Sequence, residues 1–305
     1  MLCLGSIVVD ISIQGLERFP TPGSEFTEAS DIWHSEPARL LLAGTAGNSA
    51  VVFAALTGSC DLAGPVGNDA LGEFLETGFS RRGVRLIGAA SGSTATHVIA
   101  NGVDGRRESY FHPGMSLDLP RVLASWDGGN VLITGIPLVM RRPRIAGMRH
   151  VLERAHAVGG RAVLELGQAN EDPWRLDEIT ELGNEIDLLM GSTREFDVLL
   201  GTSLADGLPR LRDAFAGPVV LKRGALGAVV HDGGREEVVP ATQVRAVNPV
   251  GAGDAFAAGF MAAWLGGRSV VDATRFACAV GAVSVATPEG PQGVTPGAVE
   301  HLFDG

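Results

Sequence analysis

The chain has 305 residues, enough for one large α/β domain or two small ones, and its 45% hydrophobic residues and 42 glycines indicate a globular, turn-rich protein. A formal net charge of −11 and a sequence isoelectric point near 5.1 argue against nucleic acid or an anionic membrane surface as the main partner. Any anionic ligand must therefore be held by local features of the chain.

The first predicted element is a buried strand from Met1 to Val9. Its start carries no basic residues, so the sequence does not favour a signal peptide. Asp10 follows directly, and in open α/β sheets ligands bind at the carboxyl ends of strands. We therefore take Asp10 as a candidate ligand-binding residue.

The three cysteines, Cys3, Cys60 and Cys278, are odd in number, far apart and set in apolar runs. This pattern is typical of reduced core residues in a cytoplasmic protein and not of a disulfide or zinc framework. No apolar stretch reaches the length that crosses a membrane. The sequence thus predicts a cytoplasmic protein that does not insert into membranes.

Residues 11–40 lack a helical period and predict a small appended sheet, to which a hairpin over residues 93–115 returns. Between them, a helix is expected to begin in the run from Gly44 to Asn48. Asn48 is either a cap or an interior polar residue of that helix. Polar residues beside such a glycine pair are also suitable ligands for hydroxyl groups.

Further along, apolar strands at 131–134, 162–166, 186–190 and 219–222 alternate with helices. This alternation predicts an α/β fold with a doubly wound, mostly parallel sheet flanked by helices. Ser192 and Glu195 have the spacing of a helix capping box. Lys222 is the only lysine, so a Walker A loop, which needs Gly-Lys-Ser/Thr, is absent.

The most informative stretch runs from Asn248 to Phe256. Gly251 and Gly253 allow backbone N–H groups to approach a ligand at the start of a helix, which favours an anion site. The carboxylate of Asp254 would repel an anion bound there, so its presence indicates a chemical task, such as accepting a proton from an attacking hydroxyl. The structural alternative is a helix N-terminal carboxylate favoured by the dipole. The spacing does not fit a dinucleotide fingerprint, which disfavours hydride chemistry.

Five motifs in this order resemble the ribokinase-like (PfkB) carbohydrate kinase family over nearly the whole chain. They are Ala43 to Ala50 with Asn48, Gly64-X-X-Gly67-X-Asp69-X-X-Gly72, Gly83-Val84, Lys222-X-Gly224-X-X-Gly227, and Gly251-Ala252-Gly253-Asp254.

The resemblance implies an ATP-dependent kinase that phosphorylates a hydroxyl of a sugar or sugar-like molecule, with Mg²⁺ as cofactor. It implies a general base at Asp254 and an anion hole built by the amides of Gly251, Ala252 and Gly253. The residues that it assigns to the acceptor are Asp10, Gly44 and Asn48. Those on the nucleotide side are Ser192, Lys222, Gly224 and Gly227, with Glu195 at the magnesium ion.

It also implies one ribokinase-like domain over residues 1–305, with residues 11–40 and 91–113 forming a sheet-like lid. Such a lid closes over the acceptor, excludes water and often pairs in homodimers. Two alternatives remain open at this stage. One is a nucleoside kinase of the same fold, and the other is a non-catalytic sugar or nucleotide sensor derived from a kinase.

The chain departs from the family pattern at four places. The first glycine of the N-terminal pair is Ala43. Ser192 replaces the asparagine of an Asn-X-X-Glu motif, and the strand-end Asp-X-Asn reads Glu165-X-Gly167. The Asp-Thr that usually precedes the anion hole is Asn248-Pro249. Because that acid commonly helps to hold a monovalent cation, its loss argues against activation by potassium. The departures together indicate a divergent member with an unusual acceptor.

Overall fold

The structure, a computed structural model, describes residues 1–19, 34–88, 91–167 and 172–304. Nine strands of the described chain form one sheet in the order β13-β12-β11-β10-β9-β8-β1-β4-β5. Neighbours from β11 to β5 are parallel, whereas β12 and β13 form an antiparallel hairpin at one edge. The strands are β1 (Leu2–Gly5), β4 (Cys60–Ala63), β5 (Val84–Leu86), β8 (Val131–Thr134), β9 (Ala162–Glu165), β10 (Leu188–Ser192), β11 (Val219–Lys222), β12 (Ala228–Asp232) and β13 (Arg235–Val239).

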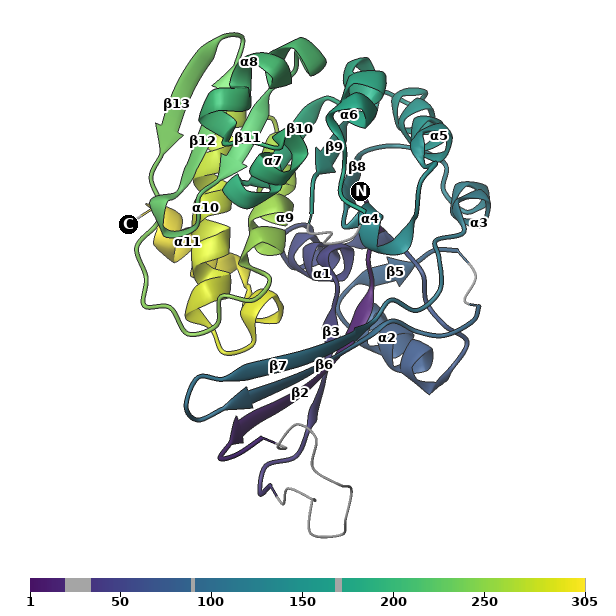
Figure 1. Cartoon of the computed structure of the whole chain (residues 1–305), viewed down its shortest axis with the longest axis vertical. Helices are drawn as coiled ribbons and strands as arrows, with labels where there is room; N and C mark the ends of the chain where they lie inside the picture. The colour runs from purple at the N-terminus through teal and green to yellow at the C-terminus, as the bar shows by residue number, and fades with distance from the viewer. Residues whose placement is uncertain (20–33, 89–90, 168–171, 305) are drawn as a thin grey trace.

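Helices cover both faces of this sheet (Figure 1). Buried residues of one face pack against α1 (Thr45–Thr57), α2 (Ala70–Ser80), α9 (Ala252–Leu265), α10 (Val270–Ala286) and α11 (Pro296–Asp304). Those of the other face pack against α3 (Leu119–Ala124), α4 (Ile136–Val139), α5 (Ile145–His156), α6 (Leu176–Leu182), α7 (Thr193–Leu200) and α8 (Leu204–Ala214). The predicted fold class, a doubly wound and mostly parallel sheet, is confirmed.

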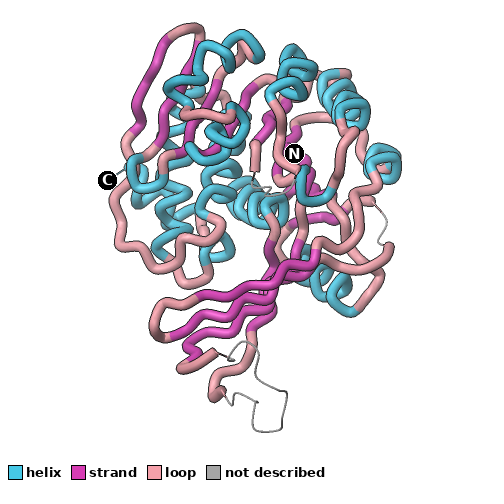
Figure 2. Tube along the Cα trace, in the orientation of Figure 1, coloured by secondary structure: helices cyan, strands magenta, loops and turns pink. Residues whose placement is uncertain are grey.

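A second, smaller sheet projects from this body (Figures 1 and 2). Its four described strands have the order β3-β2-β6-β7. They are β2 (Val8–Leu16), β3 (Arg39–Ala43), β6 (Thr96–Gly102) and β7 (Arg107–His112). The appended sheet and the returning hairpin are thus found near the predicted places. Residues 20–33 of the first predicted segment lie outside the described part of the chain.

The single first strand predicted from Met1 to Val9 is wrong, because the chain changes sheets at Ser6. β1 belongs to the large sheet and β2 to the small one. The hydroxyl of Ser6 accepts a hydrogen bond from the backbone N–H of Thr45 at 3.0 Å, and the Ser6 carbonyl accepts one from Ala46 at 3.1 Å. These bonds satisfy N–H groups at the start of α1. Asp10 therefore lies within a strand of the small sheet and not at the end of a core strand.

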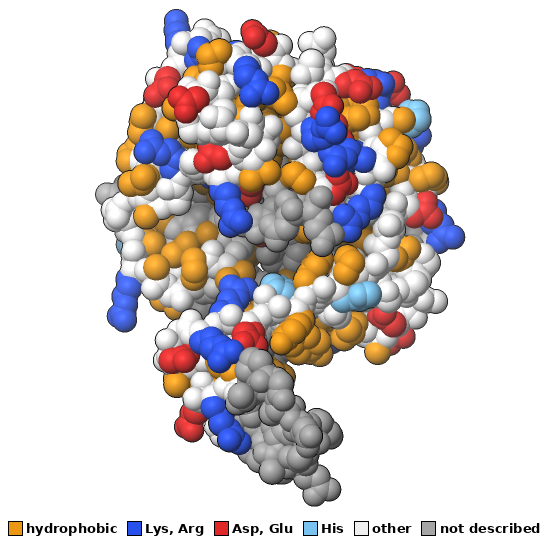
Figure 3. Space-filling model, viewed as in Figure 1, with side chains coloured by type: hydrophobic (Ala, Val, Ile, Leu, Met, Phe, Trp, Pro, Cys, Tyr) orange, Lys and Arg blue, Asp and Glu red, His pale blue; other side chains and the backbone are white. Residues whose placement is uncertain are grey.

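The three cysteines are free and buried, as predicted, and the sulfurs of Cys3 and Cys60 are 3.8 Å apart. Within the described ranges, no helix is both long and apolar enough to span a membrane. The surface is hollowed where the small sheet meets the body (Figure 3). This hollow lies on the side to which the carboxyl ends of the parallel strands point, as expected for an open α/β sheet.

Candidate active site

The carboxyl ends of β9, β10 and β11 carry three polar residues, Glu165, Ser192 and Lys222. Glu165 is in register with Met190, and Ser192 with Lys222, so Glu165 and Lys222 flank β10. Each ends an otherwise apolar strand and is itself largely buried, with 3% and 12% of the side chain exposed. Because buried charges are costly unless they are paired, these residues indicate a site.

The first turn of α9 lies beside Lys222, whose Nζ is 3.2 Å from the position that a Cβ on Gly253 would occupy. Gly251 is the N-cap and has φ = +75°, a left-handed conformation that favours glycine. A Cβ there would also stand 2.4 Å from a side-chain carbon of Pro291. The amides of Gly253 and Asp254 have no acceptor within the helix, as at any helix start. The amide of Ala252 donates to the Pro249 carbonyl at 3.4 Å. The segment from Gly251 to Asp254 thus starts a helix on a glycine, with unpaired amides in its first turn.

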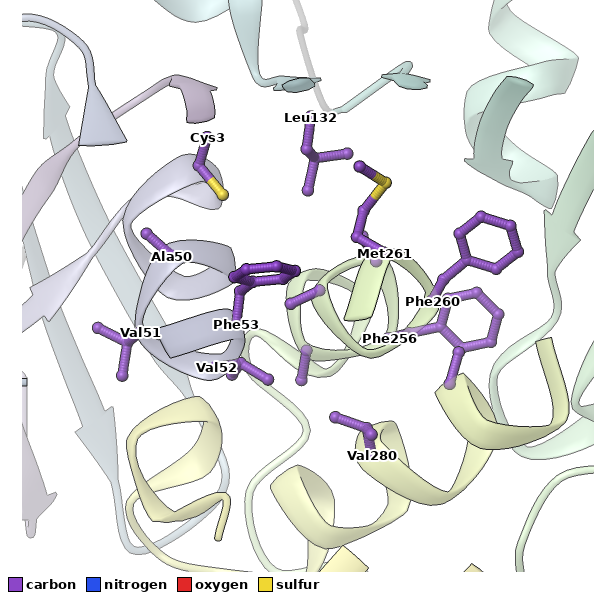
Figure 4. Packing of buried hydrophobic residues seen from close by; sticks show 14 of the residues in the cluster. Cys3, Ala50, Val51, Val52, Phe53, Leu132, Phe256, Phe260, Met261 and Val280 are labelled. Atoms are coloured by element: carbon purple, nitrogen blue, oxygen red, sulfur yellow. The ribbon is translucent and has the colours of Figure 1, made fainter. Parts of the chain in front are cut away.

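Asp254 is held by α1. The side-chain amide of Asn48 donates to Oδ2 of Asp254 at 2.7 Å, and the hydroxyl of Ser49 donates to the Asp254 carbonyl at 3.1 Å. Apolar residues of the same two helices, among them Phe53 of α1 and Met261 of α9, belong to one buried cluster (Figure 4). Residues 206 positions apart in the sequence are thus fixed in one arrangement.

The surroundings of Asp254 raise its pKa to about 8 from an ordinary value of 3.8. Burial is the largest cause, and the negative charge of Glu165 adds to it. The hydrogen bond from Asn48 and the positive charge of Lys222 act in the opposite direction. A carboxyl group with a pKa near neutrality can accept and release a proton during a reaction.

Glu165 is a site residue that the sequence did not assign. Its Oε1 forms an ion pair with the Lys222 ammonium, and its Oε2 accepts a hydrogen bond from the Thr134 hydroxyl at 2.7 Å. The sequence feature that could have indicated its role is a carboxylate at the end of an otherwise apolar strand. In the sequence, Glu165 appears only as a departure from the family pattern.

Ser192 and Glu195 form the predicted capping box at the start of α7. The Ser192 hydroxyl accepts from the Glu195 amide, and Oε2 of Glu195 accepts from the Ser192 amide at 2.8 Å. Oε1 of Glu195 has no hydrogen-bond donor among the described residues. No group of three or more His, Cys, Asp and Glu residues there is arranged to hold a metal ion. A single free carboxylate oxygen fits Mg²⁺, which usually binds one or two protein carboxylates together with substrate phosphates.

Three glycines of the predicted site differ in what surrounds them. A Cβ on Gly44 would meet the Ser6 carbonyl oxygen at 2.4 Å, and one on Gly227 would meet the Val239 carbonyl oxygen at 2.1 Å. Both residues have positive φ, so the fold requires glycine there for its own packing. Gly224 also has positive φ, but its Cβ position is open.

Asp10 lies on β2 in register with His97 of β6. The His97 Nδ1 is 3.6 Å from Oδ1 of Asp10, and the His97 ring packs edge-on against Phe111. The structure therefore brings Asn48 and Asp254 together directly. The side chain of Asp10 instead lies beside His97, which also belongs to the small sheet.

Asn248 bridges two loops beside the start of α9. Its side-chain amide donates to the Pro288 carbonyl at 3.0 Å, and its Oδ1 accepts from the Val250 amide at 3.1 Å. The backbone between Asn248 and α9 is thus tied to the loop after α10 by neutral hydrogen bonds.

Comparison with known proteins shows the family to which the chain belongs. The profile of the pfkB family carbohydrate kinases matches residues 3–294, nearly the whole chain. The chain belongs to the pfkB family of carbohydrate kinases. The predictions of this family and of a carbohydrate kinase are thereby confirmed.

Similar curated proteins include a ribokinase from Haemophilus influenzae, 24% identical over 98% of this chain and 96% of that protein. Another is an ATP-dependent ribose-1-phosphate kinase from Halopiger xanaduensis, 29% identical over 93% of this chain and 91% of that protein. Among solved structures, an Arabidopsis thaliana ribokinase complexed with ribose and ATP has a TM-score of 0.79 and 21% identity. It covers 100% of this chain and 98% of its own. At 21% identity, the structural similarity to this ribokinase establishes the shared fold alone.

Proposed function

We propose that the protein transfers the γ-phosphoryl group of ATP to a hydroxyl of a sugar or sugar-like small molecule, with Asp254 as general base. The carrying observation is the environment of the Asp254 carboxylate. It is held by Asn48 at 2.7 Å, lies beside the unpaired amides of a helix N-terminus, and has a pKa raised to about 8. A proton acceptor and an anion site thus adjoin each other.

In this reaction Asp254 takes the proton of the acceptor hydroxyl as its oxygen bonds to phosphorus. The bond between the γ-phosphorus and the bridging oxygen breaks, and its electron pair leaves with ADP. The amides of Gly251, Ala252 and Gly253 stabilise the negative charge on the transferring group. Asn48 keeps the carboxylate pointed at the acceptor. Such positioning is the main contribution of a protein to phosphoryl transfer.

For the nucleotide side, we propose Ser192, Lys222, Gly224 and Gly227, which lie at the ends of β10 and β11 and in the turn after β11. The open space at Gly224 fits the close approach of a ligand to the backbone. Glu195 is the proposed magnesium ligand through its free Oε1. When bound with ATP, Mg²⁺ neutralises phosphate charge.

For the acceptor, we propose Asp10 and Asn48 as hydroxyl-binding residues, with Gly44 shaping the start of α1. The small sheet, which carries Asp10, would act as a lid within a single kinase domain. Free buried cysteines support a reducing, cytoplasmic setting.

We also propose that the lid forms a homodimer through the face opposite Asp10. The residues of the next row, Leu40, Ile11, Val98 and Tyr110, are paired across the sheet and point to the other face from Asp10. Leu40 and Tyr110 are 45% and 68% exposed. An apolar row on a sheet surface fits a second copy of the same row.

Sedimentation velocity tests this arrangement. We expect a dimer for the native protein, a monomer for Tyr110→Asp, and a dimer for the control Val158→Asp, which changes a similarly exposed apolar residue shortly after α5. A monomeric native protein would contradict the proposed interface.

The function itself is tested by ADP release from MgATP in the presence of pentoses, hexoses, sugar acids, sugar phosphates and nucleosides, tried one at a time. The proposal predicts strong stimulation by one class and loss of that stimulation in Asp254→Asn. Stimulation only by nucleosides would identify a nucleoside kinase. Ligand-induced stabilisation without turnover in any mixture would favour a sensor.

A further inference from the structure

A buried ion pair at the carboxyl ends of the strands extends the role proposed above for Lys222. Lys222, the only lysine of the chain, ends β11, and its ammonium pairs with Oε1 of Glu165 at the end of β9. Only 12% of the lysine side chain and 3% of the glutamate side chain are exposed. Desolvating two charges is costly, so the position of this pair calls for an explanation beyond stability.

The glutamate is fixed on both oxygens. Oε1 contacts the ammonium, and Oε2 accepts the hydrogen bond from the hydroxyl of Thr134, which is fully buried. These two contacts fix the orientation of the Glu165 carboxylate. The carboxylate in turn holds the ammonium of Lys222 in one position even without a ligand.

That place is the start of α9. The Nζ atom of Lys222 lies 3.2 Å from the position that a Cβ on Gly253 would occupy. The amide of Gly253 is one of the unpaired donors at the helix N-terminus. An anion bound by these amides would thus meet the ammonium as well. Charge-assisted hydrogen bonds of this kind are stronger than neutral ones.

The charge balance of the site points the same way. The charges of Glu165, Glu195 and Asp254 all raise the pKa of Lys222. A negatively charged phosphoryl group that enters among these three carboxyl groups needs a cation to compensate the repulsion. Burial is the largest single influence on the pKa of Lys222 and lowers it, but the charges of Glu165, Glu195 and Asp254 and the hydrogen bond with Glu165 together raise it by more, so the pKa is raised. The side chain therefore stays protonated and cannot serve as a base at neutral pH.

We propose that Lys222 is a catalytic cation that contacts the transferring phosphoryl group, and that Glu165 is a positioning residue that holds the ammonium there. This inference rests on the proposed kinase function and adds a residue pair to it. Lys222 neither gains nor loses a proton. It stabilises charge on the equatorial oxygens while the proton moves to Asp254 and the electron pair leaves with ADP.

Calorimetric titration with two nucleotides separates this role from a purely structural ion pair. The probes are the magnesium complexes of ADP and of AMPPNP, which differ by the γ-phosphoryl group. We expect Lys222→Met to weaken AMPPNP binding by about 10- to 100-fold and ADP binding by less than about threefold. Arg235→Met is the matched control, because it removes one positive charge at the start of β13, beside the turn that joins β12 to β13.

A second variant resolves an ambiguity. Lys222→Met alone leaves Glu165 unpaired, and its charge could repel the γ-phosphoryl group or unfold the protein. The double variant Lys222→Met/Glu165→Gln removes the pair without leaving a charge. If Lys222 contacts the phosphoryl group, the double variant keeps the selective loss of AMPPNP binding. Recovery of native AMPPNP affinity in the double variant would overturn the proposal.

Kinetics test the positioning role of Glu165. Glu165→Gln keeps the ammonium but releases its tether, so we expect kcat to fall about tenfold with KM for MgATP within about threefold. In the Lys222→Met background the same substitution should lower kcat no further, because its effect acts through the lysine. Additive losses would contradict this role.

The outcomes also separate this inference from the proposed function. Failure of the native protein to bind AMPPNP would contradict both. Native binding of AMPPNP with equal losses for ADP and AMPPNP in the lysine variants would contradict the phosphoryl contact alone.

Discussion

The raised pKa of Asp254 predicts how stability changes with pH, and this can be measured without knowing the acceptor. The pKa is 3.8 in its ordinary state and about 8 in the folded protein, so the carboxyl group takes up a proton on folding between these values. Its contribution to stability is fully present below the unfolded pKa and is lost as pH rises through the folded pKa. An asparagine at this position cannot take up the proton, so the Asp254→Asn variant lacks this pH-dependent contribution.

The magnitude follows from linkage. In the middle of this window the folded state binds about one proton more than the unfolded state. The free energy of unfolding of the native protein, minus that of Asp254→Asn, should therefore fall by about 1.4 kcal/mol per pH unit between about pH 5 and 7. Above about pH 8 the difference should become level.

The assay is urea unfolding of both proteins across this range, with the difference taken at each pH so that unrelated groups cancel. Asp69→Asn is a control of opposite sign. Hydrogen bonds from the side chain and backbone of Thr94 lower the pKa of Asp69, so its stabilisation is lost only as pH falls below its ordinary value. That variant should show a flat difference between about pH 5 and 7. A flat difference for Asp254→Asn would refute the raised pKa.

Two further predictions concern catalysis. Asp254→Asn should lower kcat by roughly two to four orders of magnitude while nucleotide binding is retained, measured by initial rates and by titration with MgADP; a kcat close to native would contradict the general base. Activity should depend on magnesium but hardly on potassium, because neutral hydrogen bonds of Asn248 and the fixed φ of Pro249 order the loop before α9. Initial rates against potassium chloride, with tetramethylammonium chloride holding ionic strength constant, would show saturable activation if this account of the loop is wrong.

Much of the fold was predictable because its signals are local. Apolar strands alternating with helices predicted the parallel sheet, and the large sheet is parallel from β11 to β5. The break after Gly5 was not predictable from the run Met1 to Val9, which is uniformly apolar apart from Ser6. Its cause is a tertiary contact between Ser6 and the start of α1, a helix that begins 39 residues later.

The site divides in the same way. The helix start at Gly251 could be predicted because it depends on glycines and small residues that adjoin in sequence. The bond from Asn48 to Asp254 joins residues 206 apart, and the pair of Glu165 and Lys222 joins residues 57 apart. Such partners depend on strand order and side-chain direction, which sequence spacing does not encode.

The most direct test of the central claim is mass spectrometry of a reaction containing MgATP and the acceptor that stimulates ADP release. The account predicts a phosphorylated acceptor formed in a one-to-one ratio with ADP, and formed at a greatly reduced rate by Asp254→Asn. ADP production without a phosphorylated acceptor, or undiminished phosphorylation by that variant, would contradict it.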